Sequence, residues 1–160
     1  TVDKYKARFV AKGFSQRYGI DFSETFAPTT RMATVQTVLS LAVQQRMTIQ
    51  HLDVKGAYLN SNLDEEIYLQ QPQGYEEVDS NGVPYVCGIQ KGIYGLKQAG
   101  RRWYEALDAF LRENGFVRSS HDPCLYVYND MVWVDDFILT GPTSSVQKVK
   151  RSFGGEIRHG

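Results

Sequence analysis

Two aspartates, Asp135 and Asp136, stand next to each other between two apolar runs, Met131–Val134 and Phe137–Thr140. The pattern predicts a hairpin with both carboxylates at its turn. Adjacent carboxylates repel each other unless a positive charge lies between them, and a divalent cation bound through oxygen ligands supplies that charge. Such a pair also fits a plain solvated turn, because aspartate favours turns. The pair alone therefore leaves both interpretations open.

A third carboxylate, Asp53, ends an apolar-leaning run that begins at Thr48. Side chains alternate along a strand, so Ile49, His51 and Asp53 share one face. Three aspartates could hold two cations about 3.5–4 Å apart, the arrangement used for in-line phosphoryl displacement. One ion would activate the attacking hydroxyl and the other would hold the leaving pyrophosphate. The sequence itself does not bring Asp53 next to the adjacent pair.

Two helices are predicted to support these strands. Apolar residues at helical spacing between Val35 and Met47 indicate a helix with one apolar face and no site residues, which we interpret as core packing. A second helix is predicted over Arg101–Asn114, and Gly115 is a suitable C-terminal stop. The buried face of this second helix is expected to contain Trp103, Leu107, Phe110 and Leu111.

Short strands are predicted between the helices and after them. The predicted strands are Thr48–Leu59 with a break near Gly56, Ile67–Gln71, Tyr85–Ile89, Cys124–Tyr128, Met131–Val134 and Phe137–Thr140. Tyr5–Phe14 could be a further strand with exposed basic side chains, and Gln73–Pro84 is expected to be a mobile loop. Turns are expected at Asp122-Pro123 and Asn129-Asp130. Helices that alternate with short hairpin strands predict an α+β fold, with helices packed on an antiparallel sheet.

The composition fits one folded domain. The 160 residues are 42% hydrophobic, and the net charge is zero. Residues 1–52 carry seven Lys and Arg against three Asp and Glu, residues 53–84 carry one against seven, and residues 85–118 carry six against three. A polyanion could bind the basic segments while the acids hold cations, but charge alone favours an ordinary mixed surface. No apolar run approaches the roughly 20 residues that span a membrane, and the missing initiator Met suggests a piece of a longer polypeptide.

The two cysteines, Cys87 and Cys124, lie outside any CxxC or Cys/His cluster, so a structural zinc site is not expected. We interpret them as reduced thiols of an intracellular protein, with a single disulfide as the alternative.

The chain resembles the reverse transcriptase of Ty1/copia-type LTR retrotransposons over essentially all 160 residues. The matching stretches, in the family's order and at roughly its spacing, are YKARFVAKGFSQ, GIDFSETFAP, HLDVKGAYLNSNLDEEIYLQQPQGY, KGIYGLKQAGRRWYEAL, GFVRSSHDPCLYVY and WVDDFILTG. The resemblance implies a right-hand polymerase fold in which residues 1–160 form the palm and part of the fingers, without thumb or RNase H. It also implies RNA-directed DNA polymerase activity with magnesium, or with manganese in its place.

The resemblance also assigns roles to individual residues. Asp53 falls on the family's first metal-binding aspartate, and Asp135 and Asp136 fall on its YxDD-like pair. Tyr58 falls where reverse transcriptases keep an aromatic steric gate that excludes a ribose 2′-hydroxyl, although a plain core aromatic is the alternative. Arg8 resembles the fingers arginine along the incoming triphosphate, a task that suits a planar guanidinium.

Four further residues receive weaker assignments from the same resemblance. Lys6 and Gln98 are expected near the nucleotide, although Lys6 also fits a solvated charge. Trp133 replaces the usual tyrosine before VDD and, with Arg101, is expected to contact primer and template.

The expected partners are an RNA or DNA template with its primer, deoxynucleoside triphosphates and the rest of a Gag-Pol polyprotein, with no membrane. The expected location is a cytoplasmic virus-like particle or the nucleus. The link between Tyr128 and Trp133 is shorter than in the family, and the sequence departs from the family after Gly141. Two alternatives therefore stay open: a degenerate, inactive retrotransposon copy, or a nucleic-acid-binding module without catalysis.

Overall fold

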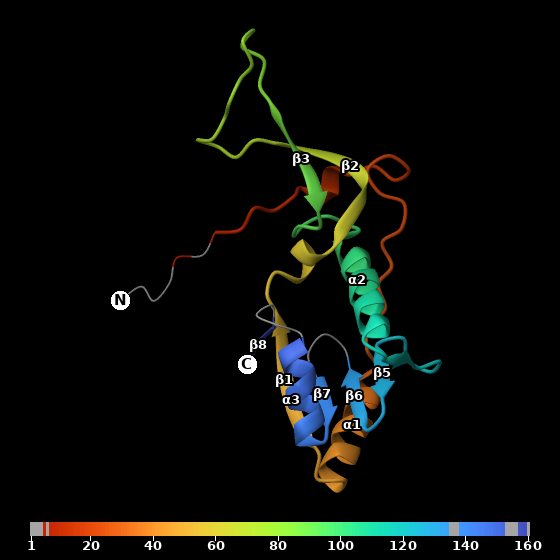
Figure 1. Ribbon diagram of the computed structural model, residues 1–160. Helices are drawn as coiled ribbons and strands as arrows, with labels where there is room; N and C mark the ends of the chain where they lie inside the picture. Colours follow the sequence, from red (N-terminus) through yellow and green to blue (C-terminus); the bar gives the residue numbers. More distant parts are fainter. Residues whose placement is uncertain (1–4, 6, 135–137, 153–156, 160) are drawn as a thin grey trace. The chain divides into compact units, whose positions relative to one another are not determined.

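The computed structural model describes residues 5, 7–134, 138–152 and 157–159, which divide into two compact units (Figure 1). The first unit contains residues 1–26 and 58–103, and the second contains residues 27–57 and 104–160. The described residues form helices and mostly antiparallel strands. The predicted α+β class is therefore confirmed.

The second unit is built on a six-stranded sheet with the strand order β4-β5-β6-β7-β1-β8, and each neighbouring pair is antiparallel. Its strands are β1 (Thr48–Val54), β4 (Val117–Arg118), β5 (Leu125–Tyr128), β6 (Met131–Val134), β7 (Ile138–Gly141) and β8 (Ile157–His159). Helices α1 (Met32–Gln44) and α3 (Thr143–Ser152) contact β1 and β7. The central strands of the sheet are thus the ones that the helices cover.

The core of the second unit follows one row of cross-strand neighbours. Tyr126 is paired with Trp133, which is paired with Leu139 on the next strand. All three side chains are at most 2% exposed, and the ring of Phe116 packs edge to face on Trp133 at 6.5 Å between centroids. Buried aromatic pairs of this geometry add stability beyond their burial, so this row fixes the register of the hairpin strands β5, β6 and β7.

The first unit is a two-stranded antiparallel sheet of β2 (Asn62–Gln70) and β3 (Val86–Lys91), with short 3-10 helices at Gly13–Ser15 and Ala57–Asn60. Its core cluster consists of Ala11, Ile67, Ile93, Leu96 and Ala99. The loop between the strands holds itself together, because the Gln71 side chain hydrogen-bonds to backbone groups of Glu77 and Tyr85. The predicted loop is therefore present and has defined internal contacts.

Helix α2 (Ala99–Glu113) begins in the first unit and continues into the second. Its predicted apolar face is confirmed for Trp103, Leu107 and Leu111, each at most 8% exposed. The predicted C-terminal stop at Gly115 is confirmed: this residue follows the helix with a φ of +86°, and its N–H bonds to the Arg112 carbonyl. The N–H of the next residue bonds to the Leu111 carbonyl, which completes a Schellman motif.

Several local expectations were wrong. Residues 7–12 form no strand, because their backbone meets a turn of the first unit and has no partner strand. The predicted break near Gly56 is confirmed, since β1 ends at Val54 and Gly56 takes a φ of +59°, but the residues after it form a 3-10 helix and not a continuation of the strand. Helix α1 buries Val38 and Ala42, but Val43 on its predicted apolar face is 69% exposed.

Elements β4, α3 and β8 were not predicted. Two other sequence-based expectations can be compared with the described residues. Both cysteines are free thiols, as expected. Among the described residues, no helix is long and apolar enough to cross a bilayer.

Asp122 forms a long-range cap on α1 and is only 2% exposed. Its carboxylate accepts a hydrogen bond from the Thr34 hydroxyl at 2.6 Å and another from the Arg31 N–H at 3.2 Å. It also accepts one from the N–H of Cys124 at 2.9 Å. The first turn of α1 contains no acid, so Asp122 supplies the negative charge that a helix N-terminus favours. Burial opposes ionisation, but the hydrogen bonds outweigh it and hold the pKa of Asp122 below its ordinary value.

We expect Asp122→Asn to lower the free energy of unfolding by about 1–3 kcal/mol at pH 7, because the amide leaves buried donors poorly matched. The folded pKa lies below the unfolded value of about 3.9, so the carboxylate contributes fully above that value. Its contribution is lost as the pH falls through the folded pKa. Urea unfolding followed by tryptophan fluorescence should give a difference from the parent chain that narrows below about pH 4.

The matched control is Asp130→Asn, an exposed aspartate in the same unit. This substitution should change stability by less than about 0.5 kcal/mol. A difference between Asp122→Asn and the parent chain that stays constant from pH 7 to pH 3 would contradict the capping role.

Candidate functional site

Asp53 lies near the end of β1, on the exposed face of that strand. Burial alternates along β1 as predicted: Leu52 is 1% exposed, whereas Ile49, His51 and Asp53 are exposed. Among the described residues, none donates a hydrogen bond to the Asp53 carboxylate or forms an ion pair with it. The carboxylate is therefore held on a strand of the sheet, and none of the side chains that the structure describes forms an ion pair with it.

Asp135 and Asp136 lie outside the described residues, as does Lys6. The residues on either side of the aspartates are described: Val134 ends β6, Ile138 begins β7, and the two are paired. Ile138 is also paired with His51, two residues before Asp53 on β1. The predicted hairpin strands are thus confirmed, and β7 lies next to the strand that carries Asp53. No group of three potential metal ligands occurs within the described part of the chain.

Trp133 is a core residue of the second unit. Its side chain has 0% exposure and packs on Phe116. Its predicted contact with primer and template stays a prediction, and it would require this ring to be uncovered. Next to it in the sheet, burial and a hydrogen bond to Asp108 raise the pKa of Tyr126 well above its ordinary value, so this phenol stays neutral.

Arg8, Tyr94 and Tyr58 form an aromatic and cationic cluster in the first unit. The Arg8 guanidinium carbon lies 5.6 Å from the centroid of the Tyr94 ring, within cation–π range. The rings of Tyr94 and Tyr58 pack edge to face, with centroids 4.9 Å apart. The structure thus connects two predicted site residues, Arg8 and Tyr58, through a third that was not predicted. The signal that could have revealed Tyr94 is an aromatic residue enclosed by glycines in GIYG.

The turn at Gly92–Gly95 holds this cluster by close backbone contacts. On one side, the Gly92 N–H bonds to the Ser61 carbonyl, and a Cβ at Gly92 would lie 2.8 Å from the Tyr58 carbonyl oxygen. On the other side, the Ala11 N–H donates to the Tyr94 carbonyl at 2.8 Å. A Cβ at Gly95 would collide with the Ala11 carbonyl oxygen. The glycines let three chain segments approach each other at this turn.

The side chain of Gln98 lies in the interior of the first unit and is 0% exposed. Its amide oxygen accepts a hydrogen bond from the Gln16 side chain at 3.0 Å, and its amide nitrogen donates to the Asp21 carbonyl at 2.8 Å. Its predicted nucleotide contact stays a prediction, because in this structure the amide is engaged with protein groups. A nucleotide would have to displace at least one of them.

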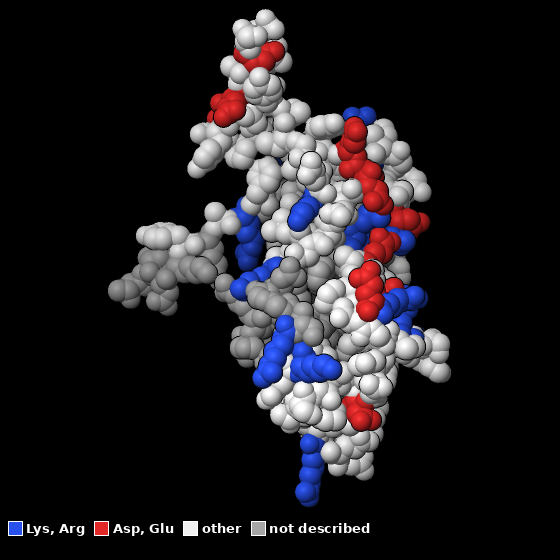
Figure 2. All heavy atoms as spheres, viewed as in Figure 1, with Lys and Arg blue, Asp and Glu red and all other residues white. Residues whose placement is uncertain are grey.

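Arginines near the start of α2 are engaged with acids. Arg101 lies 3.6 Å from the Glu24 carboxylate and donates to the Phe26 carbonyl at 3.4 Å. Arg102 forms ion pairs with Asp64 at 2.7 Å and with Glu65 at 3.2 Å. Figure 2 shows acidic and basic side chains next to one another over α2. This surface is mixed in charge, so the predicted nucleic-acid contact of Arg101 stays a prediction.

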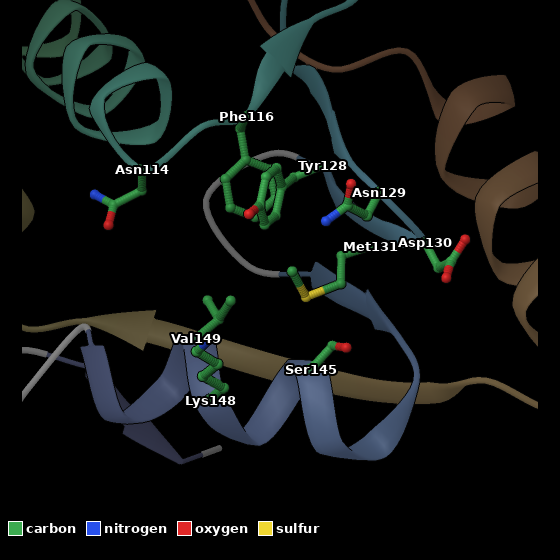
Figure 3. Close-up of a pocket in the computed structure, with 9 residues that line it drawn as sticks. All are labelled: Asn114, Phe116, Tyr128, Asn129, Asp130, Met131, Ser145, Lys148 and Val149. Atoms are coloured by element: carbon green, nitrogen blue, oxygen red, sulfur yellow. The ribbon is translucent and has the colours of Figure 1, made fainter.

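An open cavity of about 680 Å³ lies in the second unit, between the β5–β6 turn and α3 (Figure 3). The rings of Phe116 and Tyr128 lie together on one side of it, and Lys148 and Val149 of α3 lie on the other. Its remaining lining residues are Asn114, Asn129, Asp130, Met131 and Ser145. None of the predicted site residues that the structure describes lines this cavity, so we do not assign the candidate site to it.

Comparison with known proteins gives the chain a clear set of relatives. Residues 1–157 match the family model described as reverse transcriptase (RNA-dependent DNA polymerase). The chain is 40% identical to the Pol polyprotein from transposon TNT 1-94 of Nicotiana tabacum over 146 residues, which is 86% of the chain and 11% of that protein. It is 43% identical to the Pol polyprotein from transposon RE2 of Arabidopsis thaliana over 148 residues, which is 88% of the chain and 10% of that protein.

A more distant relative is the Ty1-DR5 Gag-Pol polyprotein of Saccharomyces cerevisiae, 32% identical over 139 residues, which is 84% of the chain and 8% of that protein. The chain therefore spans about a tenth of the length of the plant polyproteins that it matches. No solved structure matches it.

Each alignment with a plant relative is longer than the stretch of this chain that it covers. The alignment with the RE2 protein runs over 148 residues but takes in 88% of the 160-residue chain, which is about 141 residues. The alignment with the TNT 1-94 protein runs over 146 residues and takes in 86%, which is about 138 residues. Each plant relative thus has about seven or eight residues in the matched stretch without a counterpart here.

We expect Gly95→Ala to detach the Ala11 backbone from the turn, because the new Cβ would meet the Ala11 carbonyl oxygen and φ is +93°. Amide hydrogen exchange at Ala11, measured by NMR, should become faster. The matched control is Gly74→Ala, where φ is +85° but no atom lies within 4 Å. The control should show only the backbone cost of about 1–2 kcal/mol and should leave Ala11 protected. Equal protection in both variants would contradict the role of this close contact.

Proposed function

The chain belongs to the reverse transcriptase (RNA-dependent DNA polymerase) family, in its copia-type retrotransposon branch, and we propose that it is the nucleotide-adding part of such a polymerase. In this proposal it extends a primer 3′-hydroxyl with deoxynucleotides on an RNA or DNA template. We infer that the second unit corresponds to the palm and the first unit to part of the fingers.

The observation that carries the proposal is the pairing of β1 with β7. It joins the strand of Asp53 to one arm of the hairpin that contains Asp135 and Asp136. Two strands of one sheet lie about 4.8 Å apart. Residues near neighbouring strand ends can therefore share a pair of metal ions.

The donor set fits magnesium, since it consists of carboxylate oxygens, and manganese uses the same ligands. When bound, the two ions supply activation of the primer hydroxyl and stabilisation of the leaving pyrophosphate. Asp53 contributes an exposed carboxylate on a strand of the sheet and has no cationic partner among the side chains that the structure describes. Asp135 and Asp136 supply the other carboxylates in this proposal.

In the first unit, we propose that Arg8 binds the triphosphate of the incoming nucleotide and that Tyr58 excludes a ribose 2′-hydroxyl. Support comes from their joint packing on Tyr94. Arg8 is exposed and forms no ion pair among the described residues, so its positive charge is available to an anion. Tyr58 is partly buried against the core of this unit, which restricts the position of its ring.

A second candidate is a decayed copy of the same polymerase. It is favoured by the residues that the plant relatives have and this chain lacks. We infer that the missing residues belong between Tyr128 and Met131, where a two-residue turn, Asn129-Asp130, joins β5 to β6. Shorter strands here would change how firmly the aspartate hairpin is held. The expected partners, the rest of a Gag-Pol polyprotein and a virus-like particle, belong equally to both candidates.

We predict that the chain binds Mn²⁺ and that Asp53→Asn weakens this binding about tenfold or more, because affinity depends on the number of charged oxygen ligands. Electron paramagnetic resonance of free Mn²⁺ measures the effect without any turnover. The control is Asp130→Asn, which removes an exposed carboxylate of the same unit that is not a proposed ligand. Identical affinities for the parent chain and Asp53→Asn would argue against the proposed metal site.

Primer extension tests the activity, using the chain fused to the thumb-bearing continuation of a copia-type relative. We expect magnesium-dependent extension on an RNA template, and a loss of at least about 100-fold for Asp135→Asn, since metal ligation contributes several kcal/mol to transition-state stabilisation. Asp130→Asn should stay active.

A third fusion inserts the relative's additional residues between Tyr128 and Met131. If only this fusion extends the primer, the chain is a decayed copy inactivated by its short hairpin. If no fusion extends it although all are folded, the proposed polymerase activity is wrong.

A further inference from the structure

The Tyr94 side chain has a different partner on each side. The Arg8 guanidinium carbon lies 5.6 Å from its ring centroid, and the Tyr58 ring packs on it at 4.9 Å with an interplanar angle of 66°. Tyr94 is itself 44% exposed, so the cluster is open to solvent. Its backbone is fixed by the close contacts of the Gly92–Gly95 turn. Because its backbone is fixed, the Tyr94 ring can restrict the positions of the Arg8 and Tyr58 side chains.

The contact between Arg8 and Tyr94 orients a positive charge without neutralising it. A carboxylate partner would accept hydrogen bonds from the guanidinium and so compete with a bound phosphate, whereas an aromatic face attracts the cation without occupying its N–H groups as a carboxylate does. No acid pairs with Arg8 among the described residues. Tyr94 therefore preorganises Arg8 for a polyanionic ligand.

The contact between Tyr94 and Tyr58 concerns the steric gate, that is, the selection of the nucleotide sugar. A steric gate discriminates only if its ring stays in place when a 2′-hydroxyl presses against it. Tyr58 is partly buried against the core of the first unit, and the edge-to-face packing of Tyr94 limits rotation of its ring. Loss of the Tyr94 ring would leave Tyr58 present but less constrained.

We infer that Tyr94 is a positioning residue that serves both halves of nucleotide recognition, triphosphate binding through Arg8 and sugar selection through Tyr58. This inference rests on the proposed function. It assigns a role to a residue that touches neither the metal ions nor the reacting atoms. It also predicts that one substitution alters affinity and sugar preference together, while the metal site stays intact.

Isothermal titration calorimetry of the chain tests the inference with three probes: inorganic tripolyphosphate, dGTP and GTP. Magnesium can be present without turnover, because no primer is added. Tyr94→Leu should weaken tripolyphosphate binding about two- to fivefold, the range expected for an exposed cation–π contact. It should also lower the preference for dGTP over GTP. Tyr94→Phe keeps the ring and should retain both properties.

A double-mutant cycle separates positioning from a general structural effect. In an Arg8→Gln background, Tyr94→Leu should no longer change the affinity for tripolyphosphate. An equal loss with and without Arg8, or unchanged affinity and sugar preference, would overturn the inference. Amide exchange at Ala11 reports whether the turn is intact, and Tyr94→Met replaces Tyr94→Leu if that protection is lost. Absence of binding by the parent chain to all three probes would overturn the proposed nucleotide site itself, which is a different outcome.

Discussion

The antiparallel pairing of β1 with β7 is the constraint on which the second unit depends. It joins Thr48 to Gly141 and His51 to Ile138, residues that are far apart in the sequence. Closing so long a loop costs conformational entropy, which the burial of apolar surface must offset. The buried row of Tyr126, Trp133 and Leu139 supplies part of this burial. Without this pairing, the strand of Asp53 would not lie next to β7, the strand that follows Asp135 and Asp136 in the sequence.

In the sequence, two adjacent aspartates directly follow an apolar strand of this sheet. Trp133 and Val134 are fully buried up to the last described residue of β6, and the neighbouring Tyr126 stays neutral. Adjacent carboxylates repel each other unless a positive charge offsets the repulsion. In the proposed function, the metal ions would supply that charge. The packed core would also keep the proposed ligands in a fixed geometry.

In the first unit, backbone contacts at glycines hold the candidate site residues in place. Its sheet has only two strands and its core is small, so side-chain packing alone holds it weakly. Backbone contacts that only glycine permits, at Gly92 and Gly95, hold the segments of Arg8 and Tyr58 against one turn. The side chains of this cluster can therefore remain partly exposed while their main chains are fixed. Such a cluster can receive a ligand without first being assembled.

The sequence by itself determined the family, the α+β class and the hairpin strands around Asp135 and Asp136, because periodicity and long motifs are local signals. It also determined that Ile49, His51 and Asp53 share one face of their strand, and the structure shows that this face is exposed. Only the tertiary structure decided that β1 pairs with β7 and that Tyr94 joins Arg8 to Tyr58. Strand order and contacts across a turn join distant residues, and no local pattern encodes them. For the same reason, the burial of the Trp133 side chain could not be predicted: alternation gives the face of a strand, but not what covers it.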